Sequence, residues 1–80
     1  WYVYMVECAD NTLYIGITND LESRMAKHNT GKGAKYTRNR LPVILKATWD
    51  YESKSEAAKA EYAFKKLSRK QKLQLIDENQ

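Results

Sequence analysis

The chain opens with two short apolar runs, at residues 1–8 and 12–18, that are rich in aromatic and β-branched side chains. Runs of this kind on either side of a few polar residues predict a β-hairpin. Because side chains alternate between the two faces of a strand, the loop length decides which residues share a face. A two-residue loop, Asp10-Asn11, would place Tyr4 and Tyr14 on opposite faces. A three-residue loop that includes Ala9 places them on the same face.

We predict the three-residue loop, with Asn11 in a left-handed, bulged turn. In this register Tyr4 pairs with Gly16, and Val6 pairs with Tyr14. The longer loop gives the better apolar face, because it brings together Val3, Met5, Leu13, Ile15 and Ile17. The two tyrosines share the opposite face.

A helix is predicted after the hairpin, capped by Asn19 or Asp20 and running to about Asn29, with Gly31 as its stop signal. A long, glycine-containing basic loop follows and is closed by Pro42. The next residues are again rich in β-branched and aromatic side chains. They predict a third strand from about residue 43 to residue 51.

Two capping boxes, in which Ser is followed three residues later by Glu or Gln, predict the remaining helices. Ser53 and Glu56 precede a helix that runs to about Leu67, and Ser68 and Gln71 precede a short final helix. The order strand, strand, helix, strand, helix, helix predicts an α+β fold. In this α/β sandwich, helices flank a three-stranded antiparallel sheet.

Composition limits the class of protein. The 80 residues, of which 42% are hydrophobic and 30% charged, make one small globular domain spanning residues 1–80. Cys8 is the only cysteine, which excludes an internal disulfide or a thiolate zinc cluster and suits the reducing cytoplasm. No apolar run approaches the roughly 20 residues that a membrane-spanning helix needs. We expect a cytoplasmic monomer without a membrane partner.

The net charge of +4 is unevenly distributed. Residues 24–40 and 65–72 contain basic side chains and no acid, which suggests a polyanionic partner such as nucleic acid. Solvated helix faces and a flexible loop are the commoner cause of a charge run alone. The expected nucleic-acid contacts are Lys32, Lys35, Tyr36, Arg38, Lys66, Arg69 and Lys70. Tyr36 would either stack on an unpaired base or cover the domain.

The candidates for chemistry are Tyr4, Tyr14, Arg24, His28 and Glu61. Arg24 and His28 are four residues apart and share a row on the first predicted helix. Glu61 falls at the rim of the apolar stripe of the next helix, where it can point into a cleft or pair with Lys65. Gly16 is a structural candidate, because the missing side chain allows a helix or a substrate to approach the strand closely. Taken singly, each polar side chain also has an ordinary structural explanation.

The order and spacing of these residues resemble the GIY-YIG nuclease domain over nearly the whole chain. Tyr14-Ile15-Gly16 matches the second family motif, and the segment GKGAKYTR is similar to the small stand-alone bacterial GIY-YIG proteins. Two positions differ from the family pattern. Tyr2-Val3-Tyr4 replaces Gly-Ile-Tyr, and an asparagine that often follows the family's glutamate has no clear counterpart.

The resemblance implies a nuclease that hydrolyses DNA phosphodiester bonds with one metal ion and selects branched or single-stranded DNA. Glu61 would hold one Mg²⁺ or Mn²⁺. Arg24 would bind the phosphate and lower the pKa of Tyr4, so that this phenol acts as the general base. Tyr14 would orient the water or the metal shell, and His28 would accept or relay a proton. The alternative is a nucleic-acid-binding module with weak or lost catalysis.

Overall fold

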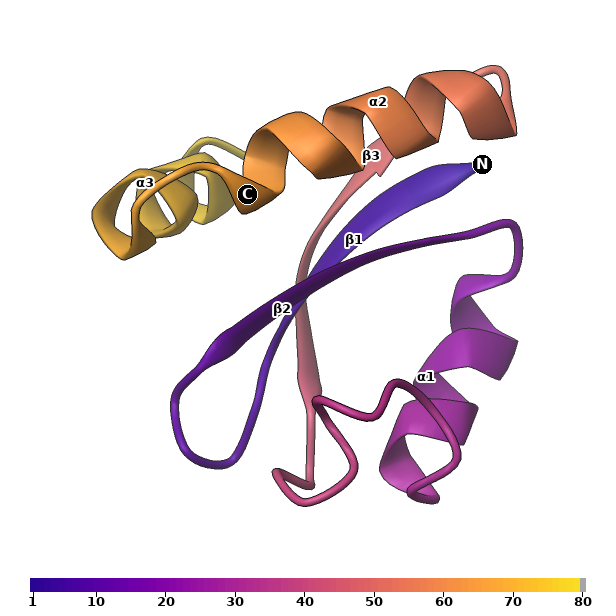
Figure 1. Ribbon diagram of the computed structural model, residues 1–80, viewed down its shortest axis with the longest axis vertical. Helices are drawn as coiled ribbons and strands as arrows, with labels where there is room; N and C mark the ends of the chain where they lie inside the picture. The colour runs from indigo at the N-terminus through magenta and orange to yellow at the C-terminus, as the bar shows by residue number, and fades with distance from the viewer. Residues whose placement is uncertain (80) are drawn as a thin grey trace.

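The computed structural model describes residues 1–79, and its elements follow the predicted order (Figure 1). They are β1 (Tyr2–Glu7), β2 (Leu13–Thr18), α1 (Leu21–Asn29), β3 (Ile44–Asp50), α2 (Lys54–Lys65) and α3 (Arg69–Asn79). The strands form one antiparallel sheet in the order β2-β1-β3, so β1 lies in the middle. This arrangement confirms the predicted α+β fold.

The hairpin has the predicted three-residue loop. Asn11 has a φ of 67°, its backbone N–H donates to Cys8 O over 2.9 Å, and the Cys8 N–H donates to Thr12 O over 2.8 Å. The register pairs Tyr4 with Gly16, which confirms the choice of the longer loop. Tyr4 and Tyr14 consequently lie on the same side of the sheet, with ring centroids 6.3 Å apart.

The sheet is a middle layer with a hydrophobic core on each face. On one face, Val3 and Met5 pack with Ile15, and with Ala57 of α2 and Ile76 of α3. The other face carries a second core of Tyr4, Val6, Cys8 and Val43, against which Leu21 and Met25 of α1 pack. Figure 1 shows α2 and α3 on the first side and α1 on the second.

Side-chain caps explain where the helices begin. Of the two predicted cap residues for α1, Asp20 is the one used: its Oδ1 accepts from the Ser23 N–H over 3.1 Å. Ser53 Oγ accepts from the Glu56 N–H at the start of α2, also over 3.1 Å. The box before α3 is reciprocal, since the Ser68 N–H donates to Gln71 Oε1 and the Gln71 N–H donates to Ser68 Oγ. α2 ends two residues before the predicted Leu67, and α3 is 11 residues long rather than short.

The basic loop between α1 and β3 is tied to the rest of the domain. The Asn29 side chain accepts from the Val43 N–H over 2.9 Å, which joins the two ends of the loop. Arg40 bridges to the hairpin, because its Nε donates to Asp10 Oδ2 over 2.9 Å and its carbonyl accepts from the Ala9 N–H. The loop is thereby held over the face of the sheet that carries the tyrosines.

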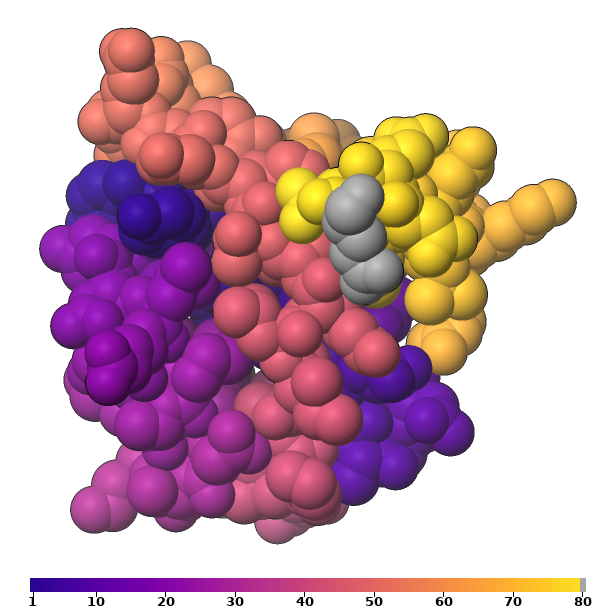
Figure 2. All heavy atoms as spheres, turned by 180° about the vertical axis from the view of Figure 1, so that it is seen from behind, coloured from indigo at the N-terminus to yellow at the C-terminus, as the bar shows by residue number. Residues whose placement is uncertain are grey.

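On the back of the molecule, β3, the second edge strand, runs between α1 and α3 (Figure 2). Ile44 and Leu45 are exposed there, at 58% and 40% of their surface. Within residues 1–79, every helix is too short or too polar to cross a membrane.

The positive φ of Asn11 generates a prediction about stability. Asn11→Ala should lower the free energy of unfolding by about 1 kcal/mol, because a Cβ-bearing residue without a polar side chain is disfavoured in the left-handed region. Asn11→Gly is the matched control and should cost less, since glycine adopts this conformation freely. Urea denaturation measures both changes, and an equal loss in the two variants would contradict the turn geometry.

Candidate active site

Tyr4 lies at the centre of the site and is fully buried in β1. Its ring lies across Gly16, its partner on β2. A Cβ added to Gly16 would come within 2.6 Å of Tyr4 Cζ, which is closer than van der Waals contact allows. The group that approaches the glycine is therefore the Tyr4 ring itself, and Gly16 makes the room that this phenol occupies.

His28, in the last turn of α1, is fully buried beside Tyr4. Its Nε2 lies 2.8 Å from Tyr4 Oη, and its Nδ1 lies 2.8 Å from Thr37 Oγ1 in the basic loop. The Thr37 hydroxyl donates in turn to Ala34 O over 3.0 Å. One imidazole thus joins the middle strand, the first helix and the loop.

These contacts assign the tautomer of His28. A threonine hydroxyl carries one proton, and that of Thr37 is used on Ala34 O. With that proton on Ala34 O, Thr37 accepts from His28 Nδ1, so this arrangement favours the tautomer with the proton on Nδ1 and a free lone pair on Nε2. Tyr4 Oη then donates its proton to Nε2. The result is a directed chain of hydrogen bonds from Tyr4 to His28, Thr37 and Ala34.

Arg24 covers the other side of the phenol. Its Nε–H donates to Tyr4 Oη over 3.1 Å, and this hydrogen bond raises the pKa of Arg24. Arg24 is one helical turn before His28, so the predicted row of α1 does face the sheet. The phenol oxygen accepts from a permanent cation and donates to a neutral base.

Burial outweighs the expected lowering of the Tyr4 pKa by Arg24, which is itself present. Burial raises the pKa of the Tyr4 phenol above its ordinary value, and Arg24 opposes this shift only in part. Ionising a buried phenol costs more than one neighbouring guanidinium returns. Burial, and to a lesser degree Arg24, also lowers the pKa of His28, so the imidazole is neutral at pH 7.

Tyr14 extends the aromatic cluster towards the basic loop. Its ring centroid lies 5.5 Å from His28 in an edge-on arrangement and 5.9 Å from the ring of Tyr36 in a stacked one. The Arg40 guanidinium also lies over the Tyr36 ring, at 4.3 Å. Tyr36 therefore packs against the domain, in line with the second of its two predicted roles, while 41% of its surface stays exposed.

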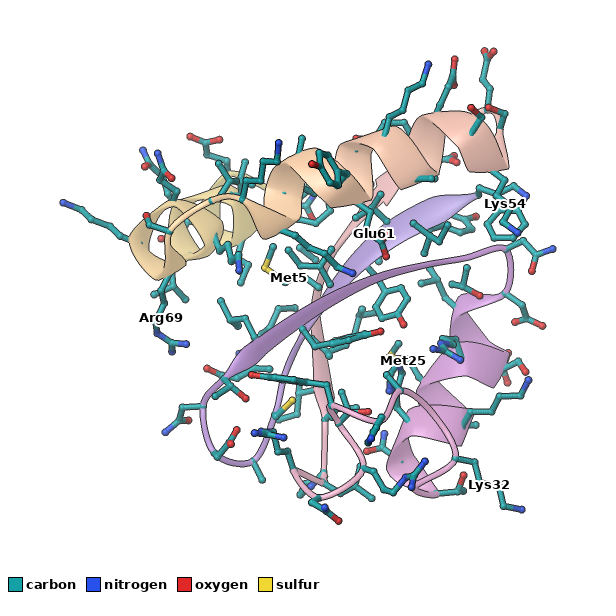
Figure 3. The ribbon with its side chains drawn as sticks, viewed as in Figure 1. Met5, Met25, Lys32, Lys54, Glu61 and Arg69 are labelled. Carbon is teal, nitrogen blue, oxygen red and sulfur yellow. The ribbon has the colours of Figure 1, made fainter. Side chains whose placement is uncertain are left out.

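Glu61 points from α2 towards the sheet (Figure 3). Burial is the main cause of the raised pKa of Tyr4, and the Glu61 carboxylate adds the smallest contribution to it. It also forms an ion pair with Lys65 at 3.7 Å, a surface contact worth about 0.2–0.5 kcal/mol. Its side chain is 23% exposed. The predicted contact with Lys65 is present, and the position of Glu61 in a cleft stays a prediction.

The residues expected to contact nucleic acid all lie on the surface of the domain. Figure 3 shows Lys32 beyond α1 and Arg69 at the start of α3, well apart from each other. Lys66 Nζ lies 4.2 Å from the ring centre of the exposed Tyr62. The other four are Lys35, Tyr36, Arg38 and Lys70, and all are exposed. Their contribution to binding stays a prediction.

Two residues of the site were not predicted individually, Gly33 and Thr37. A Cβ added to Gly33 would come within 2.9 Å of His28 Cα, so this glycine allows the loop to close over the imidazole. Thr37 is fully buried and fixes the His28 tautomer. Both lie in the segment GKGAKYTR. Its basic residues suggested a solvent-exposed loop, but Gly33 and Thr37 have structural roles within it.

The sequence matches the model of the GIY-YIG catalytic domain over residues 1–74, and the chain belongs to this family of nuclease domains. Its relatives include a UPF0213 protein of Staphylococcus haemolyticus, 54% identical over 96% of this chain and 94% of the relative. The UPF0213 protein YsiG of Lactococcus lactis subsp. lactis is 56% identical, and the matched region covers 95% of this chain and 74% of the length of YsiG.

Solved structures support the same relationship. The solution NMR structure of a UPF0213 protein from Bacillus halodurans has a TM-score of 0.61 and 53% identity, over 95% of this chain and 81% of that one. A second NMR structure, of a protein from E. faecalis, has a TM-score of 0.65 and 51% identity, with the same coverage. The resemblance read from the motifs is confirmed.

His28 is the only histidine, so NMR can follow its imidazole alone. We expect a proton on Nδ1, a free lone pair on Nε2, and a pKa below the ordinary value of 6.5. A pKa that is lower in the folded protein means that the unfolded chain binds this proton more readily. The stability contributed by His28 is then full above about pH 6.5 and declines as the pH falls below that value.

The stability measurement uses chemical denaturation between about pH 7.5 and about pH 5.5. His28→Gln, which keeps an amide donor and acceptor, is the control and should lose this part of the pH dependence. A proton found on Nε2 would refute the assigned hydrogen-bond chain, and a pKa at or above 6.5 would refute the shift caused by burial.

Proposed function

We propose that this protein is a DNA nuclease that cleaves single-stranded or branched DNA with one divalent metal ion. The observation that carries the proposal is the contact of Tyr4 Oη with both a neutral imidazole, at 2.8 Å, and a guanidinium, at 3.1 Å. A buried phenol placed between a base and a cation can take a proton from water and pass another on. Glu61, which points from α2 towards the sheet, would supply a carboxylate to the same site.

Glu61 would hold the metal ion, Mg²⁺ or Mn²⁺. Within residues 1–79, no three His, Cys, Asp or Glu side chains cluster as a metal cage, so Glu61 would be the protein ligand. One partly exposed carboxylate suits Mg²⁺, which keeps several waters and is commonly bound through one or two carboxylates and the substrate's phosphate. The ion supplies Lewis-acid stabilisation of charge at the phosphate.

In the proposed mechanism His28 is the final proton acceptor. As the attacking water gives a proton to Tyr4 Oη, the proton already on Oη moves to His28 Nε2 along the 2.8 Å hydrogen bond. This concerted transfer avoids a free phenolate, which the raised pKa of Tyr4 disfavours. Thr37 keeps Nδ1 protonated, so that Nε2 stays the basic nitrogen. The lowered pKa of His28 favours return of the proton after cleavage.

Arg24 connects substrate binding to this proton transfer. Tyr4 is fully buried, and Arg24 Nε donates to its oxygen, so we expect the guanidinium to move before water reaches the phenol. A phosphate draws the guanidinium away because it offers charged oxygens in the geometry that arginine binds best. Phosphate binding would thus expose the base at the moment when it is needed. Tyr14, which is partly exposed beside His28, would orient the attacking water.

The test is to incubate the protein with single-stranded, duplex and branched DNA in Mg²⁺, in Mn²⁺ and in a chelator. We expect metal-dependent cleavage, and a loss of at least about a hundredfold in Glu61→Gln, because metal stabilisation of charge is worth several kcal/mol. Glu56→Gln is the matched control: it makes the same change on the exposed side of α2 and should leave the rate unaltered.

Two results would count against the proposal. Binding without cleavage of any of the three DNAs, in either metal, would replace the nuclease by a nucleic-acid-binding module. Equal cleavage rates for Glu61→Gln and Glu56→Gln would show that Glu61 is not the metal ligand.

A further inference from the structure

A cavity of about 350 Å³ lies next to the candidate active site. Its lining comes from four segments: Leu13, Tyr14 and Ile15 of β2, Tyr36 of the loop, Lys65 of α2 and Lys72 of α3. Successive residues of a strand face opposite sides of the sheet. A cavity that touches three successive residues therefore opens at the free edge of β2, which is an edge strand.

The chemistry of the cavity is that of an anion site with an amphipathic wall. The two charged groups in its lining are ammonium groups, on Lys65 and on the half-buried Lys72. Leu13 and Ile15 add apolar surface, and the two tyrosines add aromatic edges with a hydroxyl each. An edge strand also presents unpaired backbone N–H and C=O groups. These groups match the three parts of a nucleotide: phosphate, sugar and base.

The cavity is continuous with the catalytic cluster through Tyr14. The Tyr14 ring lines the cavity and also lies 6.3 Å from the ring of Tyr4 and 5.5 Å from that of His28. Lys65 makes a second link, because its Nζ lies 3.7 Å from Glu61. A chain whose phosphate is at Arg24 would thus have its neighbouring nucleotide at this cavity.

We propose that the cavity binds the unpaired nucleotide next to the cleaved phosphodiester, with Lys65 and Lys72 holding its phosphate. The volume lies at the small end of the range of ligand pockets, which suits one nucleotide and not a base pair. The inference rests on the proposed nuclease function and deepens it: the site selects single strands because a paired nucleotide does not fit. When Lys65 turns to this phosphate, it also releases Glu61.

The probe is a fluorescent oligothymidylate of about six nucleotides, and its affinity is measured by anisotropy in a chelator so that no cleavage occurs. Lys72→Gln is the test variant, because Lys65 also contacts Glu61. Loss of one phosphate contact should weaken binding by about five- to tenfold at about 50 mM salt, and lower the salt slope by about 0.7. Lys59→Gln, the same change at an exposed position on α2, is the control and should bind as the parent does. Lys72→Arg should restore binding.

Equal affinities for Lys72→Gln and Lys59→Gln would overturn the cavity proposal, as would a failure of Lys72→Arg to restore binding. The two proposals can fail separately. If Lys72→Gln binds weakly but no DNA is ever cut, the cavity remains a nucleotide site and the nuclease fails. If DNA is cut in a metal-dependent way and Lys72→Gln binds normally, the nuclease stands and the cavity does not.

Discussion

The hydrogen bond from Tyr4 Oη to His28 Nε2, 2.8 Å long, joins the middle strand of the sheet to α1. The bond from His28 Nδ1 to Thr37 extends this link to the loop between α1 and β3. Tyr4, His28 and Thr37 are fully buried, and a buried polar group without a partner lowers stability by about 1–3 kcal/mol. Among the described residues, every buried side-chain nitrogen and oxygen has a partner. The fold therefore holds the catalytic candidates in place by the same contacts that satisfy its core.

The hydrogen bond between Tyr4 and His28 depends on the backbone at three separate positions: the turn at Asn11 and the glycines Gly16 and Gly33. Asn11, at a φ of 67°, sets the register that aligns Tyr4 with Gly16. Gly16 leaves space for the phenol ring, and Gly33 leaves space for the imidazole. A methyl group at either glycine would displace a ring of the pair, because packed interiors leave little room for an added carbon. Two glycines and a turn thus support one polar contact.

Local interactions made much of the fold predictable from the sequence. Turn chemistry and strand alternation determine the register of the hairpin, and the caps at Ser53 and Ser68 depend on residues three positions apart. The role of Thr37 and the net direction of the Tyr4 pKa shift could not be predicted from the sequence. Each depends on contacts between segments that only the folded chain brings together. The basic composition of the loop predicted that it is exposed to solvent, whereas Thr37 within it is fully buried. A sequence motif does not show how far a phenol is removed from water, so it does not predict the resulting rise in the pKa of that phenol.

In the proposed mechanism His28 receives the proton through Tyr4, so the pH dependence of the cleavage rate should follow the titration of the imidazole. The measurement follows single-turnover cleavage of single-stranded DNA from about pH 5 to about pH 9, beside the NMR titration of His28 under the same conditions. We expect a rate that rises with pH and levels off above the pKa of His28, which is lowered from its ordinary value of 6.5 by burial and by Arg24. A rate that continues to rise towards the ordinary pKa of a phenol, about 10, would contradict it, because the base would then be a free phenolate and not the imidazole.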